Sequence, residues 1–421
     1  MVTDCIHDSV QFPVKMPPIT QMPNLGQMCD QGVEKPSVLH LVGSPSDDFT
    51  FHLNVFYAGS FNTGYNDSGF NHWWAIIRPI DRKWALIGPD QWASYGSWVS
   101  MVDLENQSLV EDANVPWLDI GKAATFIREE LRPVFALPHL FCFAGMTEYR
   151  FLLENLNIPF IGSASMEAAA AQNKALTRAL LNEFEISVPP GKILNKSDFK
   201  LEPAFIQNLE EAVGYPCVVK PTNTENSMGI SLVHSSKDLI GALETAFSFS
   251  NQIIIDKFIR GREIRCSVVE KRRENGTKEL VVFHPQEYII AKDNIRVFSD
   301  KLAVDKRGMP TGKAPSTITN FLRREAEPEL FDRIQRLALR VHTCLNFRDF
   351  STIDVRVDES GQPYVLEANL FCSFGAKSLL NIHAKQSGWT DEQLFQVMAK
   401  NVIRRQPCKP KLCPSNGIIG A

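Results

Sequence analysis

Several features that define common classes of enzyme are missing from this 421-residue sequence. Its nine cysteines are scattered without a single CxxC pair, and its nine histidines form no HExxH motif. The cysteine pattern therefore favours reduced thiols that fill the core over a zinc site or a disulfide framework. The GxxxxGK[ST] loop that cradles phosphates in one large class of nucleotide-binding proteins is absent too.

Long hydrophobic runs and an excess of one charge are also missing. No apolar stretch reaches the roughly 20 residues that a membrane-spanning helix needs, and the N-terminus carries Asp4 and Asp8 in place of a hydrophobic signal segment. Lysine and arginine total 44 against 48 acidic residues. This balance predicts no bulk attraction to nucleic acid or to a membrane surface. We expect a cytoplasmic protein with a small-molecule ligand, held by local charges.

What is present indicates an α/β protein with more than one domain. Residues 37–42 predict a buried strand that ends in a Gly-Ser-Pro loop, and from residue 121 helical and strand patterns alternate, as they do around a parallel sheet. Six of the seven tryptophans lie within residues 53–118. They favour a local core with hairpin packing, and a pocket for a ring-bearing substrate is the alternative.

The strongest local signal is a pair of strands at 350–357 and 363–368. Asp354 and Arg356 share one face of the first strand, and Glu367 and Asn369 share one face of the second. A hairpin would bring Asp354 beside Glu367 and Asn369 as an all-oxygen cluster of the kind that suits Mg²⁺. The alternative is a solvated polar face.

Two further segments carry weaker signals. Lys220 ends an apolar strand and is followed by a Ser/Gly loop around 222–229, so its ammonium and the loop N–H groups could hold phosphate. In 253–263 a strand leads into a short linker with an acidic residue at each end, which could read an adenine and a ribose. Taken alone, this linker is also an ordinary turn.

In this order and spacing, the three segments resemble the ATP-grasp superfamily, and within it the D-alanine–D-alanine ligase-like branch. The resemblance covers about residues 130–395. It includes Asn173-Lys174, followed by Glu185-Ile-Ser-Val-Pro-Pro-Gly, which is similar to the family's DK…GxxVP segment with Asn173 in place of the acid. The implied organisation is a tail (1–36), an N-terminal Rossmann-like domain (37–165), two nucleotide-clasping subdomains (166–255 and 256–405) and a second tail (406–421).

The resemblance implies a role for each site residue. ATP would be bound by Lys174 and Lys220 at the phosphates, Ser227, Met228 and Gly229 in the covering loop, Asp256, Lys257, Phe258 and Ile259 around the adenine, and Glu263 at the ribose. Two Mg²⁺ or Mn²⁺ ions would be held by Asp354, Glu367 and Asn369, and Lys301 would reach the terminal phosphate from a lid loop. A phosphorylated substrate oxygen would then be displaced by an amine, giving a C–N bond, ADP and phosphate.

The sequence departs from D-alanine–D-alanine ligases at the substrate end. Those enzymes carry an oxyanion-stabilising arginine two residues before the first metal aspartate, where this chain has Thr352; we expect Arg356 to replace it. The loop 43–48 has no glutamate for the first substrate's amine. The residues expected at the substrates are Asn226, Ser373, Lys377 and Ser378.

A narrower resemblance, to the ligases that convert mycosporine-glycine into imino-mycosporines, involves residues 141–150, the loop at 226–229 and 367–378. It makes mycosporine-glycine plus a small L-amino acid the first substrate hypothesis and D-alanine the alternative. Other function classes stay open: an ATP-grasp kinase, or a nucleotide-binding protein without turnover. The resemblance is compatible with a homodimer.

Overall fold

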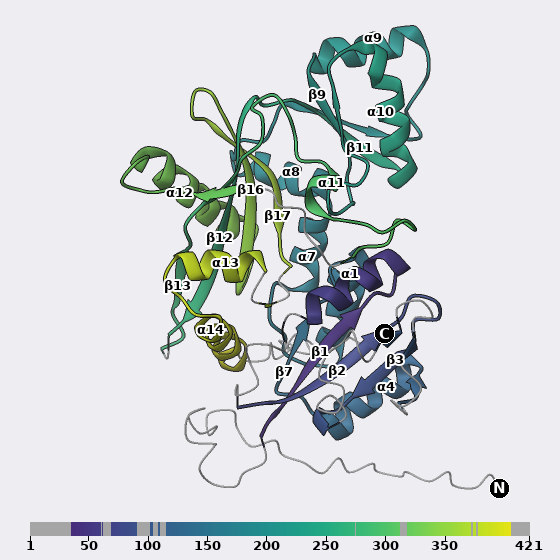
Figure 1. Ribbon diagram of the computed structural model, residues 1–421, viewed down its shortest axis with the longest axis vertical. Coiled ribbons are helices and arrows are strands. Elements are labelled where there is room, and N and C mark those ends of the chain that lie inside the picture. The colour runs from purple at the N-terminus through teal and green to yellow at the C-terminus, as the bar shows by residue number, and fades with distance from the viewer. Residues whose placement is uncertain are drawn as a thin grey trace, which may run out of the picture.

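The computed structural model describes residues 35–59, 61, 69–90, 102–103, 108–109, 115–273, 275–311, 318–371, 374–375 and 378–405. Three sheets follow one another along the chain, each with its own helices (Figure 1). Apart from residues 35 and 36, the two expected tails lie outside this part of the chain. None of the described helices combines the length and the apolar character needed to cross a membrane.

The first sheet has five strands in the order β6-β3-β2-β1-β7. Its parallel part, β2-β1-β7, agrees with the expected parallel sheet, while β3 and β6 add antiparallel strands at one edge. The strands are β1 (Ser37–Gly43), β2 (Asn71–Ile77), β3 (Trp84–Ile87), β6 (Trp117–Leu118) and β7 (Phe135–Pro138); β4 (Val102–Asp103) and β5 (Ser108–Leu109) form a separate pair.

Helices cover both faces of this sheet, which is why β1 reads as a nearly continuous apolar run. One face packs on α1 (Asp48–Gly59) and α14 (Asp391–Arg404), and the other on α4 (Ile120–Phe126), the π-helical turn η5 (Ile127–Leu131) and α6 (Glu148–Asn155). Trp74 lies in the first core and Trp84 in the second. The favoured interpretation of the tryptophans, hairpin packing, is confirmed for these two; Trp92 and Trp98 lie outside the described residues.

The second sheet is antiparallel, with the order β10-β9-β11-β8, and packs on α9 and α10. The elements are β8 (Gly191–Asn195), α9 (Pro203–Val213), β9 (Cys217–Pro221), β10 (Ser231–Val233), α10 (Ser236–Phe249) and β11 (Gln252–Lys257). The sequence patterns do not predict β8 and α9. No residue of α9 is fully buried and β8 buries only Leu194, so neither carries a strong apolar pattern.

The third sheet has the order β15-β14-β12-β16-β17, with β13 paired to β12. One of its faces packs on α12, which contributes Phe331, Ile334, Ala338 and Val341 to the apolar core. The elements are β12 (Gly261–Arg272), β13 (Lys278–Val282), β14 (Gln286–Tyr288), β15 (Thr319–Phe321), α12 (Pro328–Cys344), β16 (Phe350–Asp358) and β17 (Pro363–Asn369). The remaining helices are α5 (Phe143–Met146), α7 (Ser165–Gln172), α8 (Lys174–Glu183), α11 (Phe298–Lys301) and α13 (Leu379–Gln386).

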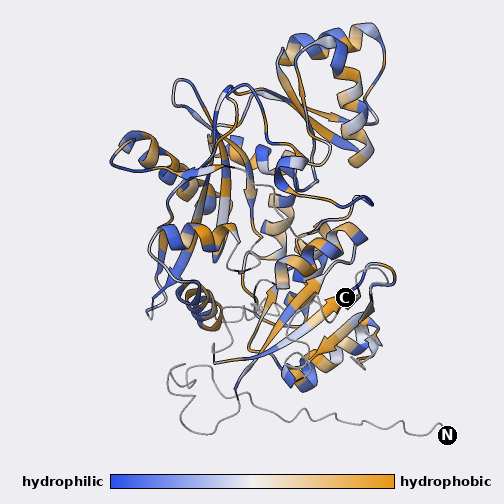
Figure 2. Ribbon diagram, viewed as in Figure 1, coloured by the Kyte–Doolittle hydropathy of each residue, from blue (hydrophilic) through white to orange (hydrophobic). Residues whose placement is uncertain are grey.

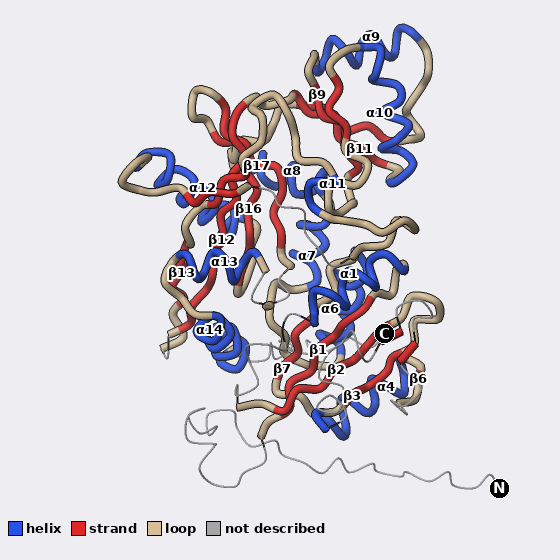
Figure 3. The backbone as a smooth tube through the Cα atoms, viewed as in Figure 1, coloured by secondary structure: helices blue, strands red, loops and turns tan. Residues whose placement is uncertain are grey.

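The alternation of side chains along β12 and β16 decides which face is chemical. Ile264, Ile353 and Val355 point into the apolar core under α12, so their charged neighbours along the strands point the other way. Figure 2 shows this mixture of hydrophobic and hydrophilic residues along the strands, and Figure 3 shows the two antiparallel sheets with α8 and α11 between them. The charged face is therefore turned towards the smaller sheet.

A buried ion pair joins the first and third sheets. Asp349, which has no exposed surface, accepts hydrogen bonds from Arg405 at 2.5 Å and from the backbone N–H of Gly162 at 2.7 Å. Arg405 also donates to the carbonyl of Phe160. Helix α14 runs back from the third sheet to cover the first, so these contacts fix the two sheets relative to each other.

Candidate active site

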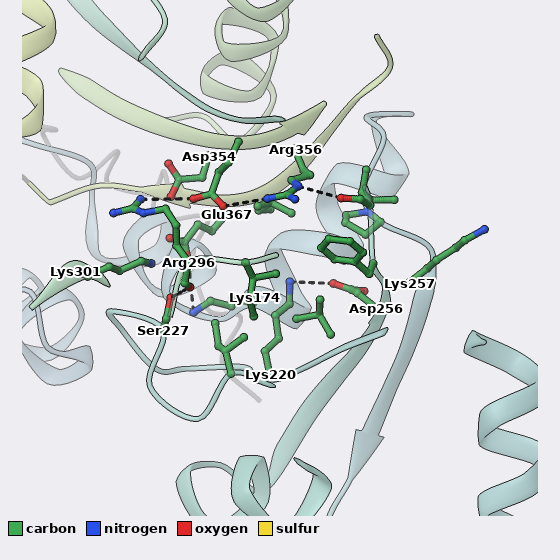
Figure 4. A pocket seen from close by; sticks show the side chains of 18 residues that line it. Lys174, Lys220, Ser227, Asp256, Lys257, Arg296, Lys301, Asp354, Arg356 and Glu367 are labelled. Atoms are coloured by element: carbon green, nitrogen blue, oxygen red, sulfur yellow. Dashed lines mark hydrogen bonds and ion pairs between the residues drawn. The ribbon is translucent and has the colours of Figure 1, made fainter. Parts of the chain in front are cut away.

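A cavity that is partly open to solvent lies between the second and third sheets. It brings together residues that are far apart in the sequence, from α8, β9, the loop after it, the β11–β12 linker, α11, β16 and β17 (Figure 4). Among its lining residues are the expected Lys174, Lys220, Ser227, Asp256, Lys257, Phe258, Ile259, Glu263, Lys301, Asp354, Arg356 and Glu367.

The expected oxygen cluster is present. Asp354 is opposite Glu367 in the β16–β17 register, and the amide of Asn369 lies 3.3 Å from an oxygen of each carboxylate. The register shifts just after Asp354, so that Leu366 is an extra residue in β17. This bulge lets the consecutive residues Leu366 and Glu367 both line the cavity, which strict alternation forbids.

Burial and the neighbouring cations act in opposite directions on the two carboxyl groups. Burial raises the pKa of Asp354 to about 6, with Glu367 adding to the shift and Arg265 opposing it. For Glu367, burial acts upwards, but Lys174 and Lys301 outweigh it and hold the pKa below its ordinary range. Glu367, on the side of the lysines, is therefore the more acidic of the two carboxyl groups.

Three lysines from three different elements line the same cavity. Lys174 begins α8, where the Asn173 side chain caps the helix by accepting from the N–H groups of residues 175 and 176. Asparagine is as good a cap as aspartate, which gives the change from the family's acid a physical reason. The Lys174 ammonium lies 3.7 Å from Glu367. Lys301, from α11, is held by burial at a pKa below its usual range.

The loop between β9 and β10 closes over one side of the cavity. Its backbone turns sharply, with φ of 53° at Asn226 and 62° at Ser227, and the Ser227 hydroxyl donates to the carbonyl of Arg296 at 3.0 Å. Gly229 has φ of 72°, and a Cβ there would lie 2.6 Å from the ring of Phe249. Glycine is therefore required at this turn. Met228 belongs to the same loop and is anchored by its N–H to the carbonyl of Glu225.

Asp256 supports the cations of the cavity. One of its oxygens is 2.9 Å from Lys220 and the other is 2.5 Å from Arg178 of α8. Lys257 continues along β11 with its side chain directed away from the cavity (Figure 4). The linker that follows leaves the N–H of Ile259 without a hydrogen bond to any described residue.

The sequence led us to expect that Arg356 replaces the arginine that is missing at Thr352. In the structure it does not take that place. Its guanidinium instead donates to the carbonyls of Ile259, Lys292 and Asn294, at 2.8–3.0 Å, and lies 3.6 Å from Glu263. Arg356 stays in register with β12, opposite Glu263, and its side chain extends along the sheet to the linker. The cation in contact with Asp354 is Arg265 of β12.

Of the expected substrate residues, Asn226 and Ser378 are described, and Ser373 and Lys377 lie outside the described residues. Asn226 is in the loop over the cavity, next to Ser227. Ser378 caps α13, where its hydroxyl accepts from the N–H of Asn381. These placements leave the roles of all four residues as predictions.

The sequence did not single out four charged residues of the site. Arg178, Arg265 and Arg296 contact the expected acidic residues, and Glu225 lies near Lys174, Lys301 and Glu367, where burial raises its pKa. Arg265 could have been found from its spacing, because it shares a strand face with Glu263. The others are brought in by the packing of separate elements, which no spacing within the sequence reveals.

The side chains present fit a magnesium-bound nucleotide. The described residues contain no group of three His, Cys, Asp or Glu side chains arranged around one point. The cluster instead offers two carboxylates and one amide, all hard oxygen donors, and keeps room for phosphate oxygens as further ligands. The lysines opposite supply the positive charge that a polyphosphate needs.

Comparison with known proteins identifies the family. Residues 180–400, slightly more than half of the chain, match the model of the D-ala D-ala ligase C-terminus. The chain belongs to this family. It is 29% identical to the D-alanine–D-alanine ligase of Geobacter sulfurreducens over 58% of this chain and 69% of that one, and 28% identical to that of Pelotomaculum thermopropionicum over 61% and 77%.

Solved structures of such ligases share the fold. The VanG D-Ala:D-Ser ligase of Enterococcus faecalis superposes with a TM-score of 0.66, 19% identity and coverage of 88% of this chain and 100% of that one. The ligase from Coxiella burnetii gives the same TM-score at 18% identity, covering 88% and 94%. The expected ATP-grasp fold is confirmed, and with it the enzyme class: this D-alanine–D-alanine ligase-like chain is an ATP-grasp ligase that forms C–N bonds.

Proposed function

We propose that this ligase phosphorylates a carboxylate oxygen of D-alanine and couples the activated group to the amine of a second D-amino acid. The observation that carries the proposal is the oxygen cluster of Asp354, Glu367 and Asn369, which faces three lysines across one cavity. The relatives at 26–29% identity are named D-alanine–D-alanine ligases, which supports this substrate over the cyclohexenone of the first hypothesis.

In this proposal, Mg·ATP supplies the phosphoryl group that activates the substrate oxygen and is released as ADP. Asp354, Glu367 and Asn369 would hold the metal ions through their oxygen atoms. Lys174, Lys220 and Lys301 neutralise the phosphates, with Asp256 orienting Lys220 at 2.9 Å. The loop at Ser227–Gly229 covers the phosphates and excludes water.

The adenine end of the cavity is assigned to the linker between the two sheets. The N–H of Ile259 is available for a purine ring nitrogen, and the ring of Phe258 offers an apolar surface. Glu263 would accept from a ribose hydroxyl while Arg296 and Arg356 hold its carboxylate at 3.5 and 3.6 Å. Positioning and electrostatics then account for most of the catalysis.

The mycosporine-type reaction is the second candidate, and two observations favour it. The loop 43–48 has no glutamate for an amino group. The rings of Tyr57, Phe141 and Phe371 pack together with centroids 5.0–5.9 Å apart, between α1 and the end of β17. Aromatic walls suit a ring-bearing electrophile.

One assay separates the candidates. Purified protein with Mg·ATP is supplied with D-alanine, with D-alanine plus D-serine, or with mycosporine-glycine plus glycine, L-serine or L-threonine, and ADP and product mass are measured. The proposal expects ADP and a D-alanyl dipeptide. ADP and an imine only with the cyclohexenone would replace it with the second candidate, and no ADP in any mixture would contradict both.

A further inference from the structure

The guanidinium of Arg265 has no part in the roles assigned above. Arg265 lies opposite Asp354 in the β12–β16 register and points to the same face of the sheet. Its Nε and Nη2 donate to the two carboxylate oxygens of Asp354. The third nitrogen, Nη1, donates to no described residue, and 10% of the side chain remains accessible.

Arg265 lies where the oxygen cluster meets the N-terminal domain. It acts electrostatically on Glu367 and Lys301 on the cavity side, and on Tyr57 of α1 on the other. The ring of Tyr288, 5.4 Å from the guanidinium carbon, flanks it. A substrate held between α1 and the metal ions would therefore meet this guanidinium.

A purely structural ion pair is a poor explanation for Arg265. By neutralising Asp354, the guanidinium weakens one of the two carboxylates that divalent cations need. Replacing a buried ion pair with apolar residues of similar volume also commonly leaves the stability of the protein unchanged or raises it. A cation at this point is useful where a further negative charge appears during the reaction.

We infer that Arg265 is a catalytic residue whose Nη1 hydrogen-bonds the substrate oxygen that becomes negative during C–N bond formation. This inference rests on the proposed function. The amine nitrogen attacks the activated carbon, and one electron pair of the C=O bond moves onto oxygen. The pair then returns, the bond from carbon to the phosphate oxygen breaks, phosphate leaves with that bonding pair, and the amine proton passes to water. Arg265 stabilises the oxyanion between these steps.

The test uses Arg265→Lys in the full chain. Lysine keeps a positive charge beside Asp354 but loses the planar fork, and so cannot bond Asp354 and the substrate together. We expect kcat to fall about 10²–10³-fold, while the Kd for Mg·ATP, measured by calorimetry, stays within about threefold of wild type because no nucleotide contact is lost. The matched control is Arg262→Lys. Arg262 is on the same strand and is also bidentate to an acid, Glu287, which is not part of the oxygen cluster.

A relocation variant separates catalysis from folding. Thr352 is two residues before Asp354 on the same strand face and lies opposite Ser267, the next residue on that face after Arg265. Arg265→Thr combined with Thr352→Arg returns a guanidinium to the same face. We expect this double variant to recover kcat about tenfold or more over Arg265→Thr alone, as one restored oxyanion donor should.

Three results would overturn the assignment. Unchanged turnover in Arg265→Lys would exclude a role for the fork, and an equal loss of Mg·ATP affinity would make Arg265 a structural partner of Asp354. A relocation variant as inactive as Arg265→Thr would also make Arg265 a structural partner of Asp354. A wild-type chain that forms no product with any substrate pair would instead contradict the proposed function, and the assignment with it.

Discussion

The third sheet and the N-terminal sheet bury polar groups in opposite ways. The third sheet buries charge in pairs, as in Arg265 with Asp354 and Arg405 with Asp349. The N-terminal sheet instead holds a cluster of imidazoles, in which buried His40 hydrogen-bonds buried His139 at 2.9 Å and partly buried His72 at 2.8 Å. No acid contributes to the pKa shifts of the three, which burial lowers first. The ion pairs of the third sheet should therefore be sensitive to removal of one partner. The stability of the N-terminal sheet should instead depend on pH.

The largest expected effect is on turnover, from the charged region. Asp354→Asn keeps the shape of the side chain but removes one of two carboxylates from the oxygen cluster and leaves Arg265 facing a neutral amide. We expect kcat to fall by about 10³-fold or more, as for loss of a preorganised charge at a transition state. Steady-state ADP release measures it, and turnover within tenfold of wild type would remove Asp354 from the metal site.

The largest expected effect on stability is at the buried pair between sheets. Asp349→Ala leaves Arg405 without its carboxylate and the N–H of Gly162 without an acceptor. Breaking a buried pair from one side costs about 3–5 kcal/mol. Urea unfolding measures the free energy of unfolding. The control is Arg128→Ala, which removes one partner of the exposed Arg128–Glu129 pair and should cost less than about 1 kcal/mol. Equal costs would show that burial is irrelevant to these pairs.

The neutral region should lose stability with acid. The folded-state pKa is about 4 for His72, about 3 for His139 and well below 6.5 for His40, so the unfolded chain binds protons that the folded chain excludes. Stability is complete above about pH 6.5 and falls from there towards pH 4. Together, these three histidines can change the free energy of unfolding by at most roughly 4 kcal/mol per pH unit.

Unfolding by urea at pH 7, 6 and 5 tests this expectation. Burial also lowers the pKa of His342 to about 4 and of His383 to about 3, so five histidines contribute to the pH slope. In the variant His72→Asn, which removes one of them, the slope should fall by about a fifth. An unfolding midpoint that does not change between pH 7 and 5 would contradict the account of the neutral cluster.

The smallest expected effect is at the linker. Arg356→Lys cannot hold the three carbonyls that the guanidinium reaches, so the adenine end should loosen while the oxygen cluster stays intact. We expect KM for ATP to rise about tenfold with kcat within about threefold. A fall in kcat alone would restore Arg356 to the reacting centre.

The two regions also differ in how far the sequence predicts them. Alternation along 350–369 was enough to place Asp354 beside Glu367, because period-2 patterning and a short turn determine such a hairpin. It could not predict the bulge at Leu366. It also could not show that Arg356 extends to the carbonyls of the linker and of the loop after it, because those residues are distant in the sequence. The histidine cluster has no sequence signal, since His40, His72 and His139 come from separate strands and a loop that only the fold brings together.

The central claim, that ATP activates a substrate oxygen for C–N bond formation, is tested most directly by isotope transfer. D-alanine with both carboxylate oxygens as ¹⁸O is incubated with enzyme and Mg·ATP, and the released phosphate is analysed by mass. The account predicts one ¹⁸O atom in each phosphate and three in each dipeptide, one in the new amide and two in the terminal carboxylate of the acceptor. Phosphate without ¹⁸O would show that the γ-phosphoryl group passed to water without substrate activation, and would contradict the claim.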